Sequence, residues 1–537
     1  MSIASTLCLA VPAMALAGWT ARWLMLPPQD RGLFGFRGVV AWWVERRLGG
    51  YRHRFHEPAS SLSDTVSKPL RVAVIGGGIA GIGAASVLGE RGADVVLYER
   101  NNHIGGKLGA WTHTFEDGSQ EVVEHGFHAF FRHYYNWNAF LDTMKLREGM
   151  RAIADYFVLK PDGTSTGFRN VDTVPMLNLY GLWRAGAYKM RDVLFTPARD
   201  YMHIFLRYDG DATFEEYDNT SYAAFAKEAH LPKDLQVVFN NFARAFFADT
   251  DKMSFAEMLK SFHSYYLSHD HGLLYDFPTV DWEEALLAPI REHLTDLGVQ
   301  IRLEHPVHVI ERDGDAFRVD GERYDSVVMA CDMPAARMLL SDREWLDEDT
   351  RHKLKSLPQG QRYAVLRFWS DRDVRGGIPP YFVTDRAFML DAVALYHRME
   401  EGAVAYQKAN GGGVYELHCY AVPDELPDED VRDRLLAEFE QFFPEMSGQI
   451  VSREILQIKD DFVALHTGAY ANRPSVQTAT PGLFLAGDWV RVPFPAMLME
   501  AAYSTGVLAA NAILEPHGTK GRALDTVPLV GLFAASR

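Results

Sequence analysis

A glycine-rich turn between an apolar run and a helical segment constrains the fold of this chain more than any other feature. Residues 70–75 are apolar and β-type, Gly76, Gly78 and Gly81 follow in a Gly-x-Gly-x-x-Gly pattern, and the next residues are rich in Ala and Leu. Strand, glycine turn and helix in this order are typical of a dinucleotide-binding unit. Such a turn lets the backbone approach a pyrophosphate, which the helix N-terminus then binds without a basic side chain.

An acidic residue at the end of the next predicted strand supports this interpretation. The strand, residues 93–98, ends in Glu99, which lies 18 positions beyond Gly81. A carboxylate at this place accepts hydrogen bonds from the hydroxyls of an adenosine ribose, and it repels a 2′-phosphate, which disfavours NADP. A turn that serves packing alone is the alternative, and this context weakens it.

A second candidate half-site lies near the other end of the chain. After the apolar run 483–486, Asp488 falls in a predicted loop where its carboxylate can accept a ribityl hydroxyl. A predicted helix over residues 499–514 begins with Met499, and its first-turn N–H groups favour the negative charge that reduction places on a flavin. The two half-sites together predict FAD as the cofactor. Asp488 as a mere turn or capping acid is the alternative.

Further segments resemble glutathione-reductase-like flavoproteins of the amine oxidase and phytoene desaturase superfamily. After Arg100 come Gly105, Gly106 and Lys107, where these families carry Gly-Gly-Arg beside the pyrophosphate. Lys in place of Arg keeps the attraction but puts a bidentate phosphate contact in doubt. Residues 124–136 resemble the Gly-x-His-x-Phe-Phe-x-x-Tyr-x-Asn segment of carotenoid desaturases. They and residues 495–506 are most similar to the β-carotene desaturase/methylases called isorenieratene synthases, and the resemblance extends from about residue 70 to about residue 515.

This resemblance implies an FAD-dependent oxidoreductase that desaturates a long apolar polyene. The implied substrate is a β-carotene-like carotenoid, changed by ring desaturation with a methyl shift or by linear desaturation, and the electron acceptor would be a quinone or O2. It places Gly126 and Phe127 beside the flavin and the backbone of Val307 at the adenine. From its position in the motif, His128 is the candidate catalytic acid–base residue. A structural role for His128 is the alternative, because a lone histidine is often structural.

The order of the elements predicts an α/β fold in which a glutathione-reductase-like FAD-binding Rossmann domain is interleaved with an α+β substrate domain, plus an N-terminal membrane-associated segment. The substrate domain would cap the flavin, and its first part looks mostly helical. The predicted divisions are 1–57 (membrane segment), 58–69 (linker), 70–150, 285–345 and 455–515 (FAD-binding domain), 151–284 and 346–454 (substrate domain), and 516–537 (C-terminal tail).

The N-terminus differs from the rest of the chain. Residues 3–19 carry no charge, whereas residues 19–57 carry seven arginines against three acids. Cations that follow the apolar run predict an uncleaved anchor with the globular part on the cytoplasmic side of a membrane. Residues 33–48 mix Trp and Phe with arginines, as a helix lying on a membrane surface does. Packing of these aromatics on the body of the protein is the alternative.

Composition limits the remaining classes of function. The 54 basic and 71 acidic residues give a net charge of −17, which argues against nucleic acid as a partner. The three cysteines form no CxxC pair, and His263, His269 and His271 lack the ordered spacing of metal ligands, so no metal site is predicted.

Two rival functions share the predicted fold. A flavin amine oxidase would need an aromatic cage and usually a lysine above the flavin, for which Lys252 and Lys260 are available. A non-catalytic carotenoid-binding membrane subunit would keep the fold and the membrane segment but lose FAD.

Overall fold

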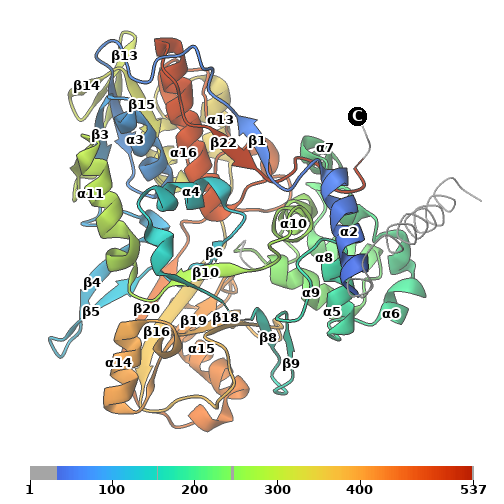
Figure 1. The fold of residues 1–537 in the computed structure, drawn as a ribbon. Coiled ribbons are helices and arrows are strands. Elements are labelled where there is room, and N and C mark those ends of the chain that lie inside the picture. The colour runs from blue at the N-terminus through green and yellow to red at the C-terminus, as the bar shows by residue number, and fades with distance from the viewer. Residues whose placement is uncertain (1–32, 154, 244–246, 535–537) are drawn as a thin grey trace, which may run out of the picture.

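The computed structural model describes residues 33–153, 155–243 and 247–534, and a five-stranded parallel sheet lies at its upper left in Figure 1. Its order is β11-β3-β2-β15-β21, and every neighbouring pair is parallel. The strands are β2 (Arg71–Ile75), β3 (Asp94–Tyr98), β11 (Gln300–Arg302), β15 (Ser326–Met329) and β21 (Leu483–Leu485). The predicted strands at residues 70–75, 93–98 and 483–486 are thus confirmed to within one residue at each end.

Two helices from opposite ends of the sequence pack against each other beside this sheet. They are α3 (Ile79–Glu90), which follows the glycine turn, and α16 (Leu498–Leu514), which matches the helix predicted over residues 499–514. Small residues let them approach closely: a Cβ atom built on Gly506 would lie 2.0 Å from the carbonyl oxygen of Ala80. Two further elements complete this part of the molecule, namely α11 (Ala288–Asp296) and an antiparallel sheet of β12 (Ile310–Asp313), β13 (Ala316–Val319) and β14 (Glu322–Tyr324).

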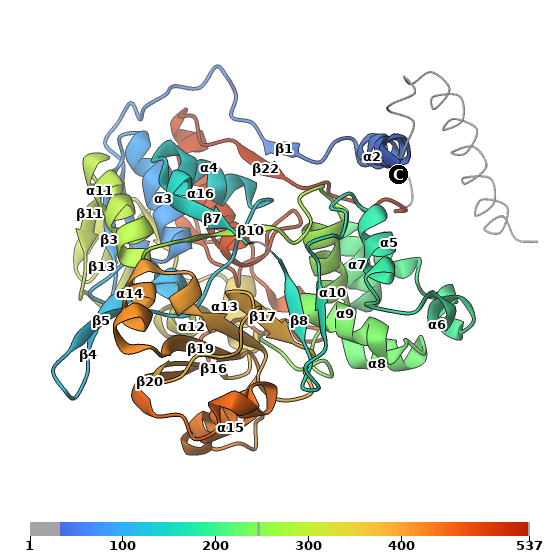
Figure 2. The ribbon, with the colours of Figure 1, turned by 60° about the horizontal axis from the view of Figure 1, so that its bottom comes forward.

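A second, seven-stranded sheet faces the first across the middle of the molecule. Its order is β20-β16-β19-β18-β17-β8-β9, antiparallel except for the parallel pair β17 and β8. The strands are β8 (Phe157–Leu159), β9 (Ser165–Gly167), β16 (Tyr363–Ser370), β17 (Tyr381–Thr384), β18 (Ala392–Leu395), β19 (Gly413–Cys419) and β20 (Val451–Lys459). Helix α15 (Asp428–Phe442) covers the outer face, where Phe439 packs on Phe368 (Figure 2). The other face is free to line a cavity.

The structure corrects the expectation that residues 151–284 are mostly helical. Helices α5 (Leu177–Arg184), α6 (Met190–Leu194), α7 (Gly210–Tyr217), α8 (Tyr222–Glu228), α9 (Lys233–Ala243) and α10 (Phe255–Phe262) lie there. However, β8 and β9 join the seven-stranded sheet, and β10 (Tyr275–Pro278) pairs with β6 (Phe130–Phe131) and β7 (Met150–Ala152). These short strands depend on partners far away in the sequence. For the same reason, the division predicted between residues 454 and 455 falls inside β20, which pairs with β16 along its length.

The N-terminal helix packs on the C-terminal segment. Helix α2 (Leu33–Leu48) has the predicted bounds, and its Val44 and Leu48 are buried against Leu532. Strand β1 (His53–His56) pairs with β22 (Leu524–Thr526), so the predicted tail 516–537 contains a strand. Over the described residues, no helix has the length and apolarity needed to cross a membrane. The anchor predicted at residues 3–19 lies outside those residues.

Candidate functional site

A cavity of about 680 Å³ lies between the two sheets. One end is walled by the glycine turn and the carboxyl ends of β2, β3 and β15, and the other by aromatic side chains of the second sheet. Ligands of α/β sheets bind beyond the carboxyl ends of the strands. Thirteen of the fourteen site residues predicted from the sequence line this cavity: Gly76, Gly78, Glu99, Arg100, Gly105, Gly106, Lys107, Gly126, Phe127, His128, Val307, Asp488 and Met499.

The glycine turn has the close backbone contacts that its pattern predicts. Gly76 adopts a φ of 109°, and a Cβ atom there would lie 2.7 Å from the backbone of Ala330. Gly81, the one predicted residue outside the lining, would place a Cβ atom 1.9 Å from the carbonyl oxygen of Gly76. Its role is therefore to pack the start of α3 on the turn, as the pattern indicates.

A second pair of glycines packs on the first. The N–H group of Gly105 donates a hydrogen bond to the carbonyl oxygen of Gly77 at 2.8 Å, and a Cβ atom on Gly106 would lie 3.0 Å from the Cα atom of Gly78. Both Gly105 and Gly106 have positive φ angles, 107° and 59°. The resulting wall is bare backbone at the N-terminus of α3, which suits a pyrophosphate.

Glu99 is buried at the base of the turn. Its carboxylate accepts hydrogen bonds from the N–H groups of Gly77 at 2.8 Å and Asn101 at 2.9 Å, so it braces the turn itself. Nδ2 of Asn101 donates a third hydrogen bond to it at 2.9 Å, and because a carboxylate has about four acceptor positions, about one is left for a predicted ribose hydroxyl. Beside it, the guanidinium of Arg100 contacts Asp332 at 3.3 Å, and Val307 lines the same end of the cavity.

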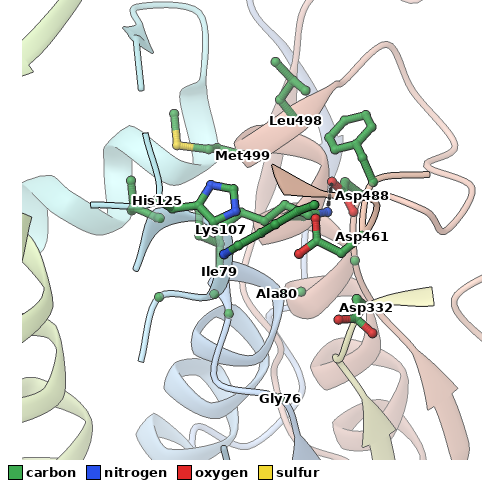
Figure 3. A pocket seen from close by; sticks show the side chains of 18 of the residues that line it. Gly76, Ile79, Ala80, Lys107, His125, Asp332, Asp461, Asp488, Leu498 and Met499 are labelled. Carbon is green, nitrogen blue, oxygen red and sulfur yellow. Dashed lines mark hydrogen bonds and ion pairs between the residues drawn. The ribbon is translucent and has the colours of Figure 1, made fainter. Parts of the chain in front are cut away.

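Lys107 connects the two half-sites. Its Nζ atom donates to Oδ2 of Asp488 at 3.2 Å, across 381 residues of sequence (Figure 3). Burial disfavours the ammonium charge, but Asp488 and Asp461 outweigh this effect and raise the pKa of Lys107. The lysine therefore stays cationic at neutral pH. Leu498 and Met499, the first residues of α16, line the cavity beside this pair.

A hydrogen-bonded chain on the same wall was not predicted from the sequence. Nε2 of His125 donates to the hydroxyl of Tyr363 at 2.8 Å, and this hydroxyl donates to Oδ1 of Asp461 at 2.7 Å. Burial lowers the pKa of His125 well below its ordinary value, so its ring is neutral at pH 7. Tyr363 and Asp461 belong to elements far from the glycine motifs, and no local pattern marks them.

His128 has a defined tautomer. Its Nδ1 atom lies 2.7 Å from the carbonyl oxygen of Gly126, which can only accept, so Nδ1 carries the hydrogen and Nε2 keeps a lone pair. Burial lowers the pKa of His128, which keeps the ring neutral at pH 7. A neutral ring with an accepting nitrogen suits a base, and the same contact braces the loop. The acid–base role of His128 stays a prediction.

The other end of the cavity is aromatic. The ring of Phe127 stacks on that of Tyr381 with centroids 4.4 Å apart, and Tyr156, Phe247, Tyr275 and Tyr420 complete this wall. Such a lining suits an apolar ligand held by shape. The lysines considered for an amine oxidase lie elsewhere: Lys252 contacts Asp424 at 2.7 Å, Lys260 contacts Glu257 at 2.6 Å, and neither lines the cavity.

Comparison with known proteins identifies relatives over most of the chain. A family model described as flavin containing amine oxidoreductase matches residues 79–514. The chain is 34% identical to a carotenoid phi-ring synthase from Streptomyces griseus, over 87% of this chain and 92% of the relative. It is 25% identical to a carotenoid phi-ring synthase from Chlorobaculum tepidum, over 88% and 93%, and 26% identical to a probable zeta-carotene desaturase from Synechococcus elongatus, over 83% and 99%.

Solved structures share the fold at low sequence identity. An oxidoreductase from Methanosarcina mazei superimposes with a TM-score of 0.59 at 15% identity, covering 83% of this chain and 100% of that one. Wild-type putrescine oxidase bound to putrescine gives 0.59 at 13% identity, with coverage of 83% and 100%. At such low sequence identities these matches show the fold alone.

Proposed function

The chain belongs to the family of flavin-containing amine oxidoreductases, and on this premise we propose that it is an FAD-dependent enzyme that desaturates a carotenoid. The observation that carries the proposal is one cavity with a glycine-walled dinucleotide end and an aromatic end. The similarity to carotenoid phi-ring synthases over nearly the whole chain supports the substrate class.

The residues present fit FAD. Gly78 and Gly106 line the cavity without side chains, where the pyrophosphate would lie at the start of α3, Glu99 would accept from the ribose, and Asp488 would accept from the ribityl chain. The start of α16 supplies N–H groups toward the ring. When bound, FAD supplies the two-electron oxidant that takes a hydride from an allylic C–H bond.

The chain's own residues would hold the substrate and accept the released proton. Phe127, Tyr381 and their neighbours position a hydrocarbon by shape, exclude water, and offer aromatic faces to the positive charge that develops along a polyene. Nε2 of His128 is the candidate acceptor of the neighbouring proton. In a conjugated substrate this charge is spread over many carbons, so no buried carboxylate has to touch it.

Ring chemistry is the form of desaturation that we propose. The identity to the phi-ring synthase of Streptomyces griseus, 34%, exceeds the 26% to the probable zeta-carotene desaturase. A cyclohexene ring becomes aromatic by two desaturations, with a methyl shift where a quaternary carbon blocks the ring. The electron acceptor, a quinone or O2, stays a prediction.

Product analysis tests this proposal. The chain is expressed in cells that accumulate either a carotenoid with cyclic end groups or a linear, partly desaturated one. We expect the cyclic substrate to lose four hydrogens per converted ring. Loss of two hydrogens from the linear substrate, with the cyclic one untouched, would contradict the ring assignment and retain the desaturase. Turnover of an amine with neither carotenoid changed would favour an amine oxidase.

We also propose that the enzyme works on a membrane surface, with its globular part on the cytoplasmic side. Half of the surface of Phe36 and Trp42 is exposed on α2, beside the exposed residues Arg46 and Arg47. Apolar rings next to cations suit an interface with anionic lipids, and the proposed substrate resides in membranes.

Flotation with anionic vesicles tests the membrane proposal. The double variant Phe36→Ser/Trp42→Ser should bind the vesicles less than the unmodified chain does, with FAD content unchanged. Ile450→Ser, which removes a more exposed apolar residue, 67% against 51% and 50%, from the substrate sheet side, is the control. Equal binding by the double variant and the control would exclude α2 as the membrane contact.

A further inference from the structure

A second histidine shares the aromatic end of the cavity. His418 lies on β19, and its side chain lines the cavity although only 3% of it is exposed. Glu416 precedes it by two positions, so both side chains are on the same face of the strand. Nε2 of His418 lies 2.9 Å from Oε1 of Glu416, whose side chain is fully buried.

The surroundings of Glu416 keep its carboxylate ionised. Nε and Nη2 of Arg367 donate to Oε2 at 3.0 and 2.7 Å, and the backbone N–H of Phe127 donates to Oε1 at 2.7 Å. Burial opposes ionisation, but Arg367 and His418 outweigh it and lower the pKa of Glu416 to about 2. The hydrogen bond to Phe127 also ties this carboxylate to the loop that carries His128.

An imidazole paired with a carboxylate can accept the proton that desaturation releases in a cavity without water. Each new double bond releases one proton, and an unpaired imidazolium in an apolar cavity carries a large desolvation penalty. The hydrogen-bond partner of His128 is a neutral carbonyl, and Glu416 favours the protonated ring without a hydrogen bond to it. Glu416 supplies a fixed negative charge 2.9 Å from Nε2 of His418, an ion-pair distance without hydrogen-bond geometry, so Nδ1 is the nitrogen left to take a proton.

We infer that His418 is a second catalytic, proton-accepting residue of this cavity and that Glu416 is its positioning residue. This inference rests on the proposed desaturase function. Bound FAD would take a hydride from one carbon of the substrate. In one of the two desaturations that make a ring aromatic, the adjacent carbon loses its proton to Nδ1 of His418, and in the other to Nε2 of His128. In each, the C–H bonding pair becomes the second pair of the new C=C bond. The imidazolium then forms an ion pair with Glu416.

Anaerobic flavin reduction by the carotenoid that the unmodified enzyme converts tests the inference. His418→Gln should retain FAD and slow bleaching of the flavin band about 10²–10⁴-fold, the range for loss of a general base. His397→Gln is the matched control. His397 is also buried and lies 2.9 Å from a carboxylate, that of Asp373, but it does not line the cavity. Bleaching at the control's rate in a fully flavinated His418→Gln variant would overturn the inference.

The charge of Glu416 separates positioning from packing. Glu416→Gln removes the anion that faces Nε2 of His418 and should slow flavin reduction, whereas Glu416→Asp keeps the charge and should restore much of the rate at equal FAD content. Equal reduction rates in the two fully flavinated variants would contradict the positioning role.

A spectroscopic measurement is independent of turnover. In FAD-loaded enzyme with ¹³C-labelled histidine, the signal missing from His418→Gln identifies His418, and Glu416→Gln should move this signal while Asp373→Asn leaves it unchanged. An unmoved signal would show that no such pair exists. If the signal moves as expected but the unmodified enzyme's flavin is not bleached by any carotenoid, the proposed function fails, and the catalytic role of His418 fails with it.

Discussion

Gly506→Ala tests how the two halves of the cofactor site are held together. A Cβ atom at this position of α16 would lie 2.0 Å from the carbonyl oxygen of Ala80 and 3.0 Å from the backbone nitrogen of Ala84, both in α3. An ordinary contact of a carbon with a carbonyl oxygen is more than 3 Å, so the helices must separate by about 1 Å. A gap of this size forfeits a quarter to a half of the dispersion energy of each contact it opens.

The net effect follows from two opposing contributions. Overpacking in a well-packed region costs about 1–3 kcal/mol, and alanine in a helix interior gains about 1 kcal/mol over glycine. The contact here is with backbone, which cannot rotate away, so we expect a loss near the upper end, about 2 kcal/mol net. Because the N-termini of α3 and α16 both line the cavity in which we propose that FAD binds, the Kd for FAD should rise about tenfold or more, which corresponds to about 1.4 kcal/mol.

The assay is the temperature at which FAD is released, followed by its fluorescence, together with the Kd measured by titration of the apoprotein. Gly38→Ala is the control, because this exposed glycine lies within α2 and a Cβ atom there meets nothing within 4 Å. We expect the control to match or slightly exceed the unmodified protein. A Gly506→Ala protein with unchanged release temperature and Kd would refute the close approach of the two helices.

Three further predictions address single side chains. Asp488→Ala should weaken FAD binding by about 1–3 kcal/mol, because it leaves a ribityl hydroxyl without its acceptor; an unchanged Kd would remove Asp488 from the site. His128→Ala should slow anaerobic flavin reduction about 10²–10⁴-fold at full FAD content if His128 is a base, whereas a lower FAD content with a normal rate per flavin would assign it to bracing the loop. Burial lowers the pKa of His263 from 6.5 to about 4. As the pH falls, this histidine is therefore protonated in the unfolded chain before it is protonated in the folded protein. Between pH 6.5 and pH 5, the free energy of unfolding measured in denaturant titrations should therefore fall about 2 kcal/mol less in His263→Gln than in the unmodified protein. An equal fall in both proteins would contradict a buried neutral His263.

The cofactor end of the site was predictable because short sequence patterns mark it. Gly81 has to be glycine because of its contact with Gly76 in the same turn, and Gly76 also adopts a positive φ in that turn. Glu99 directly follows the next strand of the same unit. Asp488 was predictable for the same reason, as it directly follows a short buried strand. The resemblance to known flavoproteins added Gly105 and Gly106, whose contact with the first turn joins adjacent elements.

The substrate end was not predictable from the sequence in this way. Tyr363, Asp461 and His418 come from β16, the segment after β20, and β19, which meet only because the antiparallel sheet folds across the cavity. None of them belongs to a motif, and alternating residues on a strand do not show which face meets a ligand. The short strands β8 and β9 were missed for a related reason, since partners distant in the sequence decide whether such segments pair.

The most direct test of the proposed function is a single-turnover experiment without oxygen. The purified protein with bound FAD is mixed with a carotenoid that has cyclic end groups, dispersed in detergent. The flavin absorbance is followed, and the molecular mass of the product is measured by mass spectrometry. A carotenoid desaturase bleaches its flavin once and yields one product molecule, two hydrogens lighter, per bound FAD. A flavin that stays oxidised with every carotenoid supplied, but bleaches with an amine, would contradict the account.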